Sequence, residues 1–133
     1  MIQNCSKLKV FDNSGAHIVK CFKNLKYKNN NKLINAIIKI SVKELKSNNS
    51  KSSIKKGQIF DALILKTKYN LPRFNGQKIL FDMNGCILID NINFKNKKTR
   101  NKLNLLGSTI SGLTLKELRV YSIKLNINAT NII

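Results

Sequence analysis

Few residues of this chain have the types and the spacing that catalysis requires. His17 is its one histidine, and no cysteine or carboxylate lies near it in the order of a catalytic triad. The six acidic residues are scattered singly beside turns or basic residues, so no carboxylate pair suggests general acid and base chemistry. The six glycines lack the spacing of a phosphate-binding loop. We therefore expect no enzymatic activity.

The cysteines do not suggest a metal centre either. Cys5, Cys21 and Cys86 are an odd number and form no CxxC pair, so neither a disulfide framework nor a zinc site is predicted. Cysteines of this kind are commonly buried and inert. We expect no metal and no other cofactor.

The basic residues are the remaining candidates for a functional site. Lys and Arg number 25 against 6 Asp and Glu, which gives a formal charge of +19 and a pI of about 10.2. Such a chain repels itself unless an acidic partner neutralises it, and solubility alone needs only a few charges. The basic residues gather in the segments 23–32, 43–56, 66–73 and 95–102. In loops, these side chains could reach the phosphates of a nucleic acid, and this is the function that the charge predicts.

Three aromatic residues lie among these bases, namely Tyr27, Tyr69 and Phe74. Aromatic rings beside cations can stack on the bases of a single-stranded nucleic acid. Each ring could equally lean inward and join the core, and the sequence leaves both interpretations open.

The elements that must position these residues are mainly strands. Alternating or β-branched apolar runs predict strands over 7–11, 17–22, 33–42, 59–66 and 86–89. The run 33–42 should bury one face and expose a basic one, whereas 59–66 is expected to be buried on both faces. Together these runs predict that the first 90 residues form a small β-barrel.

Turn signals separate the runs. Residues 12–15 place four turn formers between the first two strands, and Asn75-Gly76 is the strongest hairpin signal in the chain. Both Gly15 and Gly76 are expected to adopt a positive φ.

The character of the sequence changes after Asp90. Residues 91–112 contain many lysines and predict an exposed basic loop region. Thr114 and Glu117 have the spacing of a helix capping box, so 113–125 is expected to be a short helical part. The whole chain of 133 residues is expected to be one domain, and no apolar run is long enough to predict a membrane span.

Several short motifs occur in one order along the chain. They are Met1-Ile2-Gln3, Asp12-Asn13-Ser14-Gly15-Ala16, Val42-Lys43-Glu44, Lys55-Lys56-Gly57, Lys66-Thr67-Lys68, Phe81-Asp82 and Lys116-Glu117-Leu118-Arg119. With this order the chain resembles large-subunit ribosomal protein fourteen of the universal set, of the bacterial and organellar type. Each motif alone is weak, but the ordered set is specific and extends from residue 1 to about residue 125.

The resemblance implies a fold and a set of partners. The fold is all-β with a small α part, a five-stranded β-barrel followed by short C-terminal helices. The function is that of a structural constituent of the large ribosomal subunit, without catalysis. Its partners are large-subunit ribosomal RNA, neighbouring large-subunit proteins, and small-subunit ribosomal RNA across the subunit interface.

The residues that we expect to bind RNA combine the family's turn and corner motifs with basic residues of the predicted loops. They are Asn13, Ser14, Lys23, Lys43, Lys55, Lys56, Lys66, Lys68, Arg73, Lys95, Lys97, Lys98, Arg100, Lys116 and Arg119.

The departures from the family pattern are local. Residues 35–36 replace a Gly-Asp pair, and the loop 92–106 is several residues longer than usual. Within 107–113, Thr109 stands where the family has Arg and Leu113 where it has Pro. The resemblance therefore does not extend to contacts made through that Arg, among them the docking of the family's ribosome-silencing factor.

Composition also bears on the origin of the chain. Lys, Asn and Ile, whose codons are rich in A and T, number 22, 20 and 18. No presequence precedes the start of the family pattern, so we expect an organelle-encoded protein of the mitochondrion, with a plastid or the bacterial cytoplasm as alternatives. The alternative function is a free, basic RNA-binding translation or regulatory factor built on a similar barrel. Such a factor would not be stoichiometric with large subunits.

Overall fold

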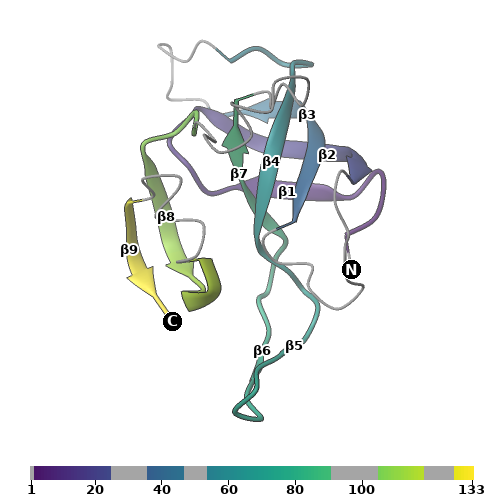
Figure 1. Cartoon of the computed structure of the whole chain (residues 1–133). Helices are drawn as coiled ribbons and strands as arrows, with labels where there is room; N and C mark the ends of the chain where they lie inside the picture. Colours follow the sequence, from purple (N-terminus) through teal and green to yellow (C-terminus); the bar gives the residue numbers. More distant parts are fainter. Residues whose placement is uncertain (1, 25–35, 47–53, 91–104, 119–127) are drawn as a thin grey trace, which may run out of the picture.

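A closed barrel of five strands forms the body of the molecule. The computed structural model describes residues 2–24, 36–46, 54–90, 105–118 and 128–133 (Figure 1). The barrel strands are β1 (Lys7–Val10), β2 (Ala16–Asn24), β3 (Ile37–Leu45), β4 (Ile59–Lys66) and β7 (Gly85–Ile89). The predicted five-stranded β-barrel is therefore confirmed.

The order of the barrel strands follows the chain until the closure. Each of the neighbours β1–β2, β2–β3, β3–β4 and β4–β7 pairs antiparallel. The barrel closes through a parallel pairing of β1 with β7, in which Lys9 lies opposite Gly85 and Val10 opposite Cys86. Gly85 lets the Phe11 ring lie close to the backbone at this closure, because a Cβ there would come within 2.6 Å of the ring and the ring would have to move.

Side-chain alternation fills the barrel. In β1 the buried Leu8 and Val10 alternate with the exposed Lys7 and Lys9, as the pleat of a strand demands. In β3 the buried residues are Ile38, Ile40 and Val42. These strands have one apolar face and one polar face, as predicted for 33–42, of which residues 33–35 lie outside the described part.

Strands β4 and β7 are buried on both faces. Their inward residues, among them Ile64 and Leu88, belong to the barrel core, whereas their outward residues, among them Leu63 and Ile87, form a second apolar cluster. We call this second cluster the outer cluster; segments after β7 cover it with Ile110, Leu115 and Leu118. The prediction that 59–66 is buried on both faces is confirmed for residues 61–66, whereas Ile59 at the start of β4 is 51% exposed.

The turn between β1 and β2 is fixed by a buried carboxylate. Asp12 is 3% exposed, and its Oδ1 accepts hydrogen bonds from the backbone N–H of Ser14, at 2.9 Å, and from the Ser14 hydroxyl. Its Oδ2 accepts the N–H of Leu88 at 2.8 Å, which ties the turn to β7. Gly15 closes the turn with φ 98°, as expected.

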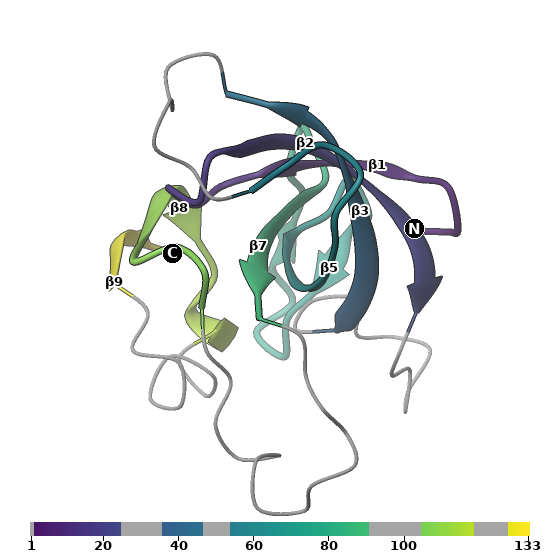
Figure 2. The same cartoon turned by 90° about the horizontal axis from the view of Figure 1, so that it is seen from above.

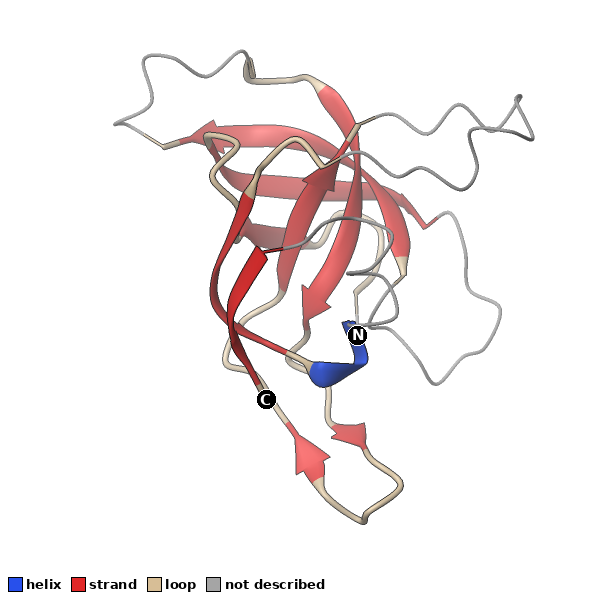
Figure 3. Ribbon diagram, turned by 60° about the vertical axis from the view of Figure 1, so that its left-hand side comes forward, coloured by secondary structure: helices blue, strands red, loops and turns tan. Residues whose placement is uncertain are grey.

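A hairpin and a small parallel sheet lie outside the barrel. Strands β5 (Leu71–Pro72) and β6 (Lys78–Ile79) form the predicted hairpin, which projects away from the barrel (Figures 1 and 3). Strands β8 (Thr109–Thr114) and β9 (Asn128–Ile132) pair in parallel and lie together beside the barrel (Figures 1 and 2).

The expected helical part requires a correction. The only helical element among the described residues of 113–125 is a 3-10 turn, Lys116–Leu118, drawn in blue in Figure 3. The strand β8 precedes it and begins at Thr109, within the region 91–112 that the sequence predicts to be a loop. Thr114 ends β8, and its hydroxyl donates to the carbonyl of Asn131 at 3.0 Å, so this side chain joins β8 to β9 and does not cap a helix. Residues 119–127 lie outside the described part. Among the helices that the structure describes, none has the length and apolar character of a membrane span.

Candidate nucleic-acid interface

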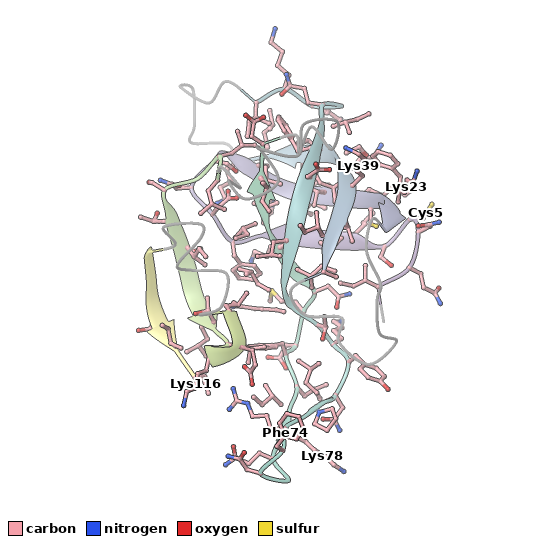
Figure 4. The ribbon with its side chains drawn as sticks, in the orientation of Figure 1. Cys5, Lys23, Lys39, Phe74, Lys78 and Lys116 are labelled. Atoms are coloured by element: carbon pink, nitrogen blue, oxygen red, sulfur yellow. The ribbon has the colours of Figure 1, made fainter. Side chains whose placement is uncertain are left out.

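Lysines cover the outer face of β1, β2 and β3. The inward positions of these strands are apolar, so the alternate positions point outward. The register places Lys7 opposite Lys20 on neighbouring strands, and Lys23 opposite Lys39. We call this surface the basic face, and it consists of Lys7, Lys9, Lys20, Lys23, Lys39 and Lys43. Figure 4 labels Lys23 and Lys39 on the same side of the barrel.

Like charges directly opposite each other across two strands are destabilising. The pair Lys7–Lys20 therefore weakens the isolated barrel, whereas the charge of Lys39 in the pair Lys23–Lys39 is partly offset by Asp61. A polyanion laid over the strands would remove this repulsion. A phosphate backbone can bind this arrangement, whose lysines lie outside the apolar core of the barrel.

The acidic residues are mostly engaged elsewhere. Asp12 is buried in the first turn, and Glu117 binds Arg73. Asp61 is fully buried and accepts a hydrogen bond from the Nζ of Lys39 at 2.9 Å, so one lysine of the basic face is partly neutralised. Little acidic charge is thus left to offset the other lysines of this face.

Six of the lysines predicted to bind RNA are exposed. Lys23 and Lys43 belong to the basic face, and Lys55 and Lys56 precede Gly57 at the corner before β4. The remaining two, Lys68 and Lys116, follow β4 and β8 respectively. All six are accessible, and their contact with RNA stays a prediction.

Asn13 and Ser14 are engaged within the chain. The Oδ1 of Asn13 accepts the N–H of Ser108 at 2.8 Å, and its Nδ2 donates to the hydroxyl of Ser108 at 3.0 Å. The Ser14 hydroxyl donates to Asp12. These two side chains connect the first turn to the segment that leads into β8, and Asn13 is nevertheless exposed.

Arg73 is held by an acid. Its Nε donates to the Oε1 of Glu117 at 2.7 Å, and a terminal nitrogen donates to Oε2 at 3.1 Å and to the carbonyl of Ile133 at 3.0 Å. The hydrogen bond from Arg73 lowers the pKa of Glu117. The bidentate geometry that suits a phosphate is therefore used here to join the hairpin to the 3-10 turn.

Lys66 lies in a setting that differs from an exposed loop. It is 7% exposed, and its Nζ lies 4.0 Å from the centre of the Phe11 ring and 5.6 Å from that of Phe81. Desolvation by burial lowers the pKa of Lys66, and the nearby charge of Lys9 lowers it further. The ammonium group of Lys66 therefore lies between two aromatic rings at the end of β4. Cation–π attraction to these rings offsets part of the free-energy cost of desolvating the charge.

The other predicted residues, Lys95, Lys97, Lys98, Arg100 and Arg119, lie outside the part that the structure describes. Conversely, the prediction did not include four lysines of the basic face, namely Lys7, Lys9, Lys20 and Lys39. The signal was present, since Lys-Leu-Lys-Val alternates and must expose its lysines. What the sequence alone did not supply was the register that places Lys20 opposite Lys7.

The cysteines offer no reactive site on this surface. Burial raises the pKa of the Cys21 and Cys86 thiols, whereas Cys5 is exposed. Within the described ranges, His, Cys, Asp and Glu form no group that could hold a metal ion.

Comparison with known proteins gives two results. A family model described as ribosomal protein L14p/L23e matches residues 1–133. The large ribosomal subunit protein uL14 of Carsonella ruddii (strain PV) is 39% identical over 124 residues, which cover 90% of this chain and 88% of that protein.

Proposed function

The chain belongs to the ribosomal protein L14p/L23e family and is a structural constituent of the large ribosomal subunit, and we propose that its basic face holds it on large-subunit ribosomal RNA. The family is a structural one, so the chain is not an enzyme. The observation that supports this placement is the register of the strands, which sets Lys7 opposite Lys20 and Lys23 opposite Lys39. Without a polyanion, the pair Lys7–Lys20 only costs stability.

The basic face would act through charge and position. Lysine ammonium groups bind phosphates as point charges and release counterions from the RNA, without reading its bases. The fixed strands hold these groups in rows, so the phosphates that they meet must follow a path across β1, β2 and β3. Exposed lysines at the corner before β4, Lys55 and Lys56, would extend this contact.

We assign the other predicted residues two kinds of role. Lys68 and Lys116 are exposed and suit direct phosphate contacts. Asn13, Ser14 and Arg73 have their polar groups bound within the chain, so we propose that they act by holding the first turn and the hairpin in place.

The finer partners and the location also belong to the proposal. Neighbouring large-subunit proteins and small-subunit ribosomal RNA would meet the chain at its C-terminal part, at the interface between the subunits. The abundance of Lys, Asn and Ile supports an A/T-rich genome, and we propose a mitochondrial ribosome. The similarity to a bacterial protein makes an A/T-rich bacterium the main alternative, and a plastid is the other.

Fractionation of native ribosomes tests the proposed function. A tagged chain should sediment with large subunits at one copy per particle, and it should be released by salt as its phosphate contacts are screened. Sedimentation with free proteins, or at far less than one copy per particle, would instead support the free RNA-binding factor.

A further inference from the structure

The side chain of Phe74 is fully exposed to solvent at the tip of the β5–β6 hairpin. Its exposed fraction is 102%, so it has no place in either apolar cluster. Figure 4 shows Phe74 and Lys78 together at the far end of the hairpin. Of the two interpretations that the sequence left open for this ring, the inward one is therefore excluded.

The geometry of the turn explains this exposure. The N–H of Gly76 donates to the carbonyl of Arg73 at 3.1 Å, and the N–H of Arg73 donates to the carbonyl of Gln77 at 2.8 Å. Gly76 has φ 76°, so the loop is a three-residue turn whose last residue is left-handed. Phe74 is the first central residue of this turn, beyond the last paired residues of the ladder, Pro72 and Lys78.

The hairpin is held firmly at its base. Leu71, Ile79 and Phe81 pack against the outer cluster. Arg73, the residue before Phe74, binds Glu117 through two hydrogen bonds and the carbonyl of Ile133 through a third. A ring attached to a fixed backbone loses little conformational freedom when it binds, so the tip is preorganised for contact.

The charge around Phe74 favours one class of partner. Residues 69–80 include Arg73 and Lys78 and no acidic residue. Glu117 neutralises Arg73, so Lys78 and Lys116, which is exposed on the neighbouring 3-10 turn, supply the positive charge near the ring. A free aromatic ring among cations matches a nucleic acid in two ways, since bases stack on rings and phosphates bind ammonium groups. An apolar pocket on a protein would be served by the ring alone and would gain nothing from the cations.

We propose that Phe74 stacks on an unpaired base of large-subunit ribosomal RNA, while Lys78 binds a neighbouring phosphate. The inference rests on the proposed function, because it takes ribosomal RNA as the partner. It goes further in naming a base contact on the hairpin, far from the basic face, where the contacts are to phosphates. The chain would then meet its RNA at two places of different chemistry.

The experiment uses the absence of tryptophan from the chain. The variant Phe74→Trp keeps a stacking ring and makes it the single tryptophan of the protein. Phe74→Leu keeps an apolar side chain without a ring, and Phe74→Ala removes both. Leu80→Ala is the matched control, because Leu80 is a second exposed apolar residue, 65% exposed, next to the same hairpin.

Each variant is titrated with a transcript of the large-subunit ribosomal RNA from the particle with which the chain co-purifies. Stacking on one base predicts that Phe74→Leu and Phe74→Ala both weaken binding, by roughly 5- to 100-fold. Phe74→Trp and Leu80→Ala should bind like the wild type, and the tryptophan fluorescence should be quenched by the RNA. Thermal melting should be the same for all variants, since the ring lies outside both clusters.

Three results would overturn the proposal. Equal binding by all variants, with no quenching, would show that the ring does not touch RNA. Wild-type binding by Phe74→Leu would show that an apolar contact suffices and that no base is stacked. Equal binding to RNA, together with poor incorporation of Phe74→Ala into whole particles, would place the ring on a neighbouring protein. Failure of the wild type to bind the transcript at all is distinct from these, because it overturns the proposed function together with the stacking.

Discussion

Replacing Lys7 and Lys20 by glutamine should change stability and RNA binding in opposite directions. The two ammonium groups lie opposite each other on β1 and β2, so each raises the free energy of the folded state of the isolated chain. Cross-strand pairs of this kind change stability by roughly 0.2 to 1 kcal/mol, with like charges on the unfavourable side. Removal of the repulsion should therefore raise the free energy of unfolding by a few tenths of a kcal/mol.

The effect on RNA binding has the other sign and a defined size. Each phosphate contact contributes about 0.7 to 0.9 to the slope of log affinity against log salt concentration. Loss of two contacts should lower the magnitude of this slope by about 1.4 to 1.8. Denaturant melting of the free chain and RNA titrations at four or more salt concentrations measure the two effects on the same preparations.

The single variants provide the control. If the repulsion is pairwise, Lys7→Gln and Lys20→Gln should each relieve it fully, and the double variant should add no further stability. Each single variant should nevertheless lose one phosphate contact, so the slopes should change additively. An unchanged slope in the double variant would refute the placement of RNA on the basic face, and lower stability in both single variants would refute the repulsion.

Gly15→Val should lower the free energy of unfolding by about 1 to 3 kcal/mol, because φ at Gly15 is 98° and a β-branched residue is strained there; equal denaturant midpoints would contradict this. Lys66→Met should make the free chain more stable at pH 7, because the lowered pKa of Lys66 means that folding disfavours its charged form. The advantage of Lys66→Met should shrink as the pH rises through the lowered pKa towards 10.5, where the wild type loses the proton that burial disfavours; a difference that stays constant between pH 7 and pH 10.5 would contradict the assignment.

The barrel could be predicted because its strands follow local rules. Alternation marks β1 and β3, and the continuous apolar run at 59–66 marks a strand that has no solvent face. The turn formers at 12–15 and at Asn75-Gly76 identify two reversals of the chain. Each of these signals lies within about ten residues, so no knowledge of distant segments was needed.

The C-terminal sheet could not be predicted because its cause is not local. The strand β8 pairs in parallel with β9, which begins more than a dozen residues later, and a bridge joins Asp12 to Ile110. Thr114 and Glu117 have the spacing of a capping box, but their partners are Asn131 and Arg73. A motif of four residues predicts a helix only when no tertiary partner competes for the same groups.

The same limit applies to the candidate site. Its lysines could be recognised as a class from the charge of the chain, but which of them are displayed depends on packing. Lys66 and Arg73 are engaged with rings and with Glu117, whereas Lys7 and Lys20 form a like-charged pair that only the register reveals.

The strands of the barrel differ in how many of their faces are buried. Strands β4 and β7 bury residues on both faces, such as Leu63 and Ile64 on the two sides of β4, so they contribute apolar burial twice over. Strands β1, β2 and β3 bury one face each and are left with an outer face on which lysines oppose lysines. Burial in the β4–β7 half can offset the repulsion between Lys7 and Lys20, so the isolated chain can fold without a partner on its basic face. On the proposed function, the exposed lysines of this face would bind phosphates with little competition from acidic side chains, since the Asp61 carboxylate that pairs with Lys39 is buried.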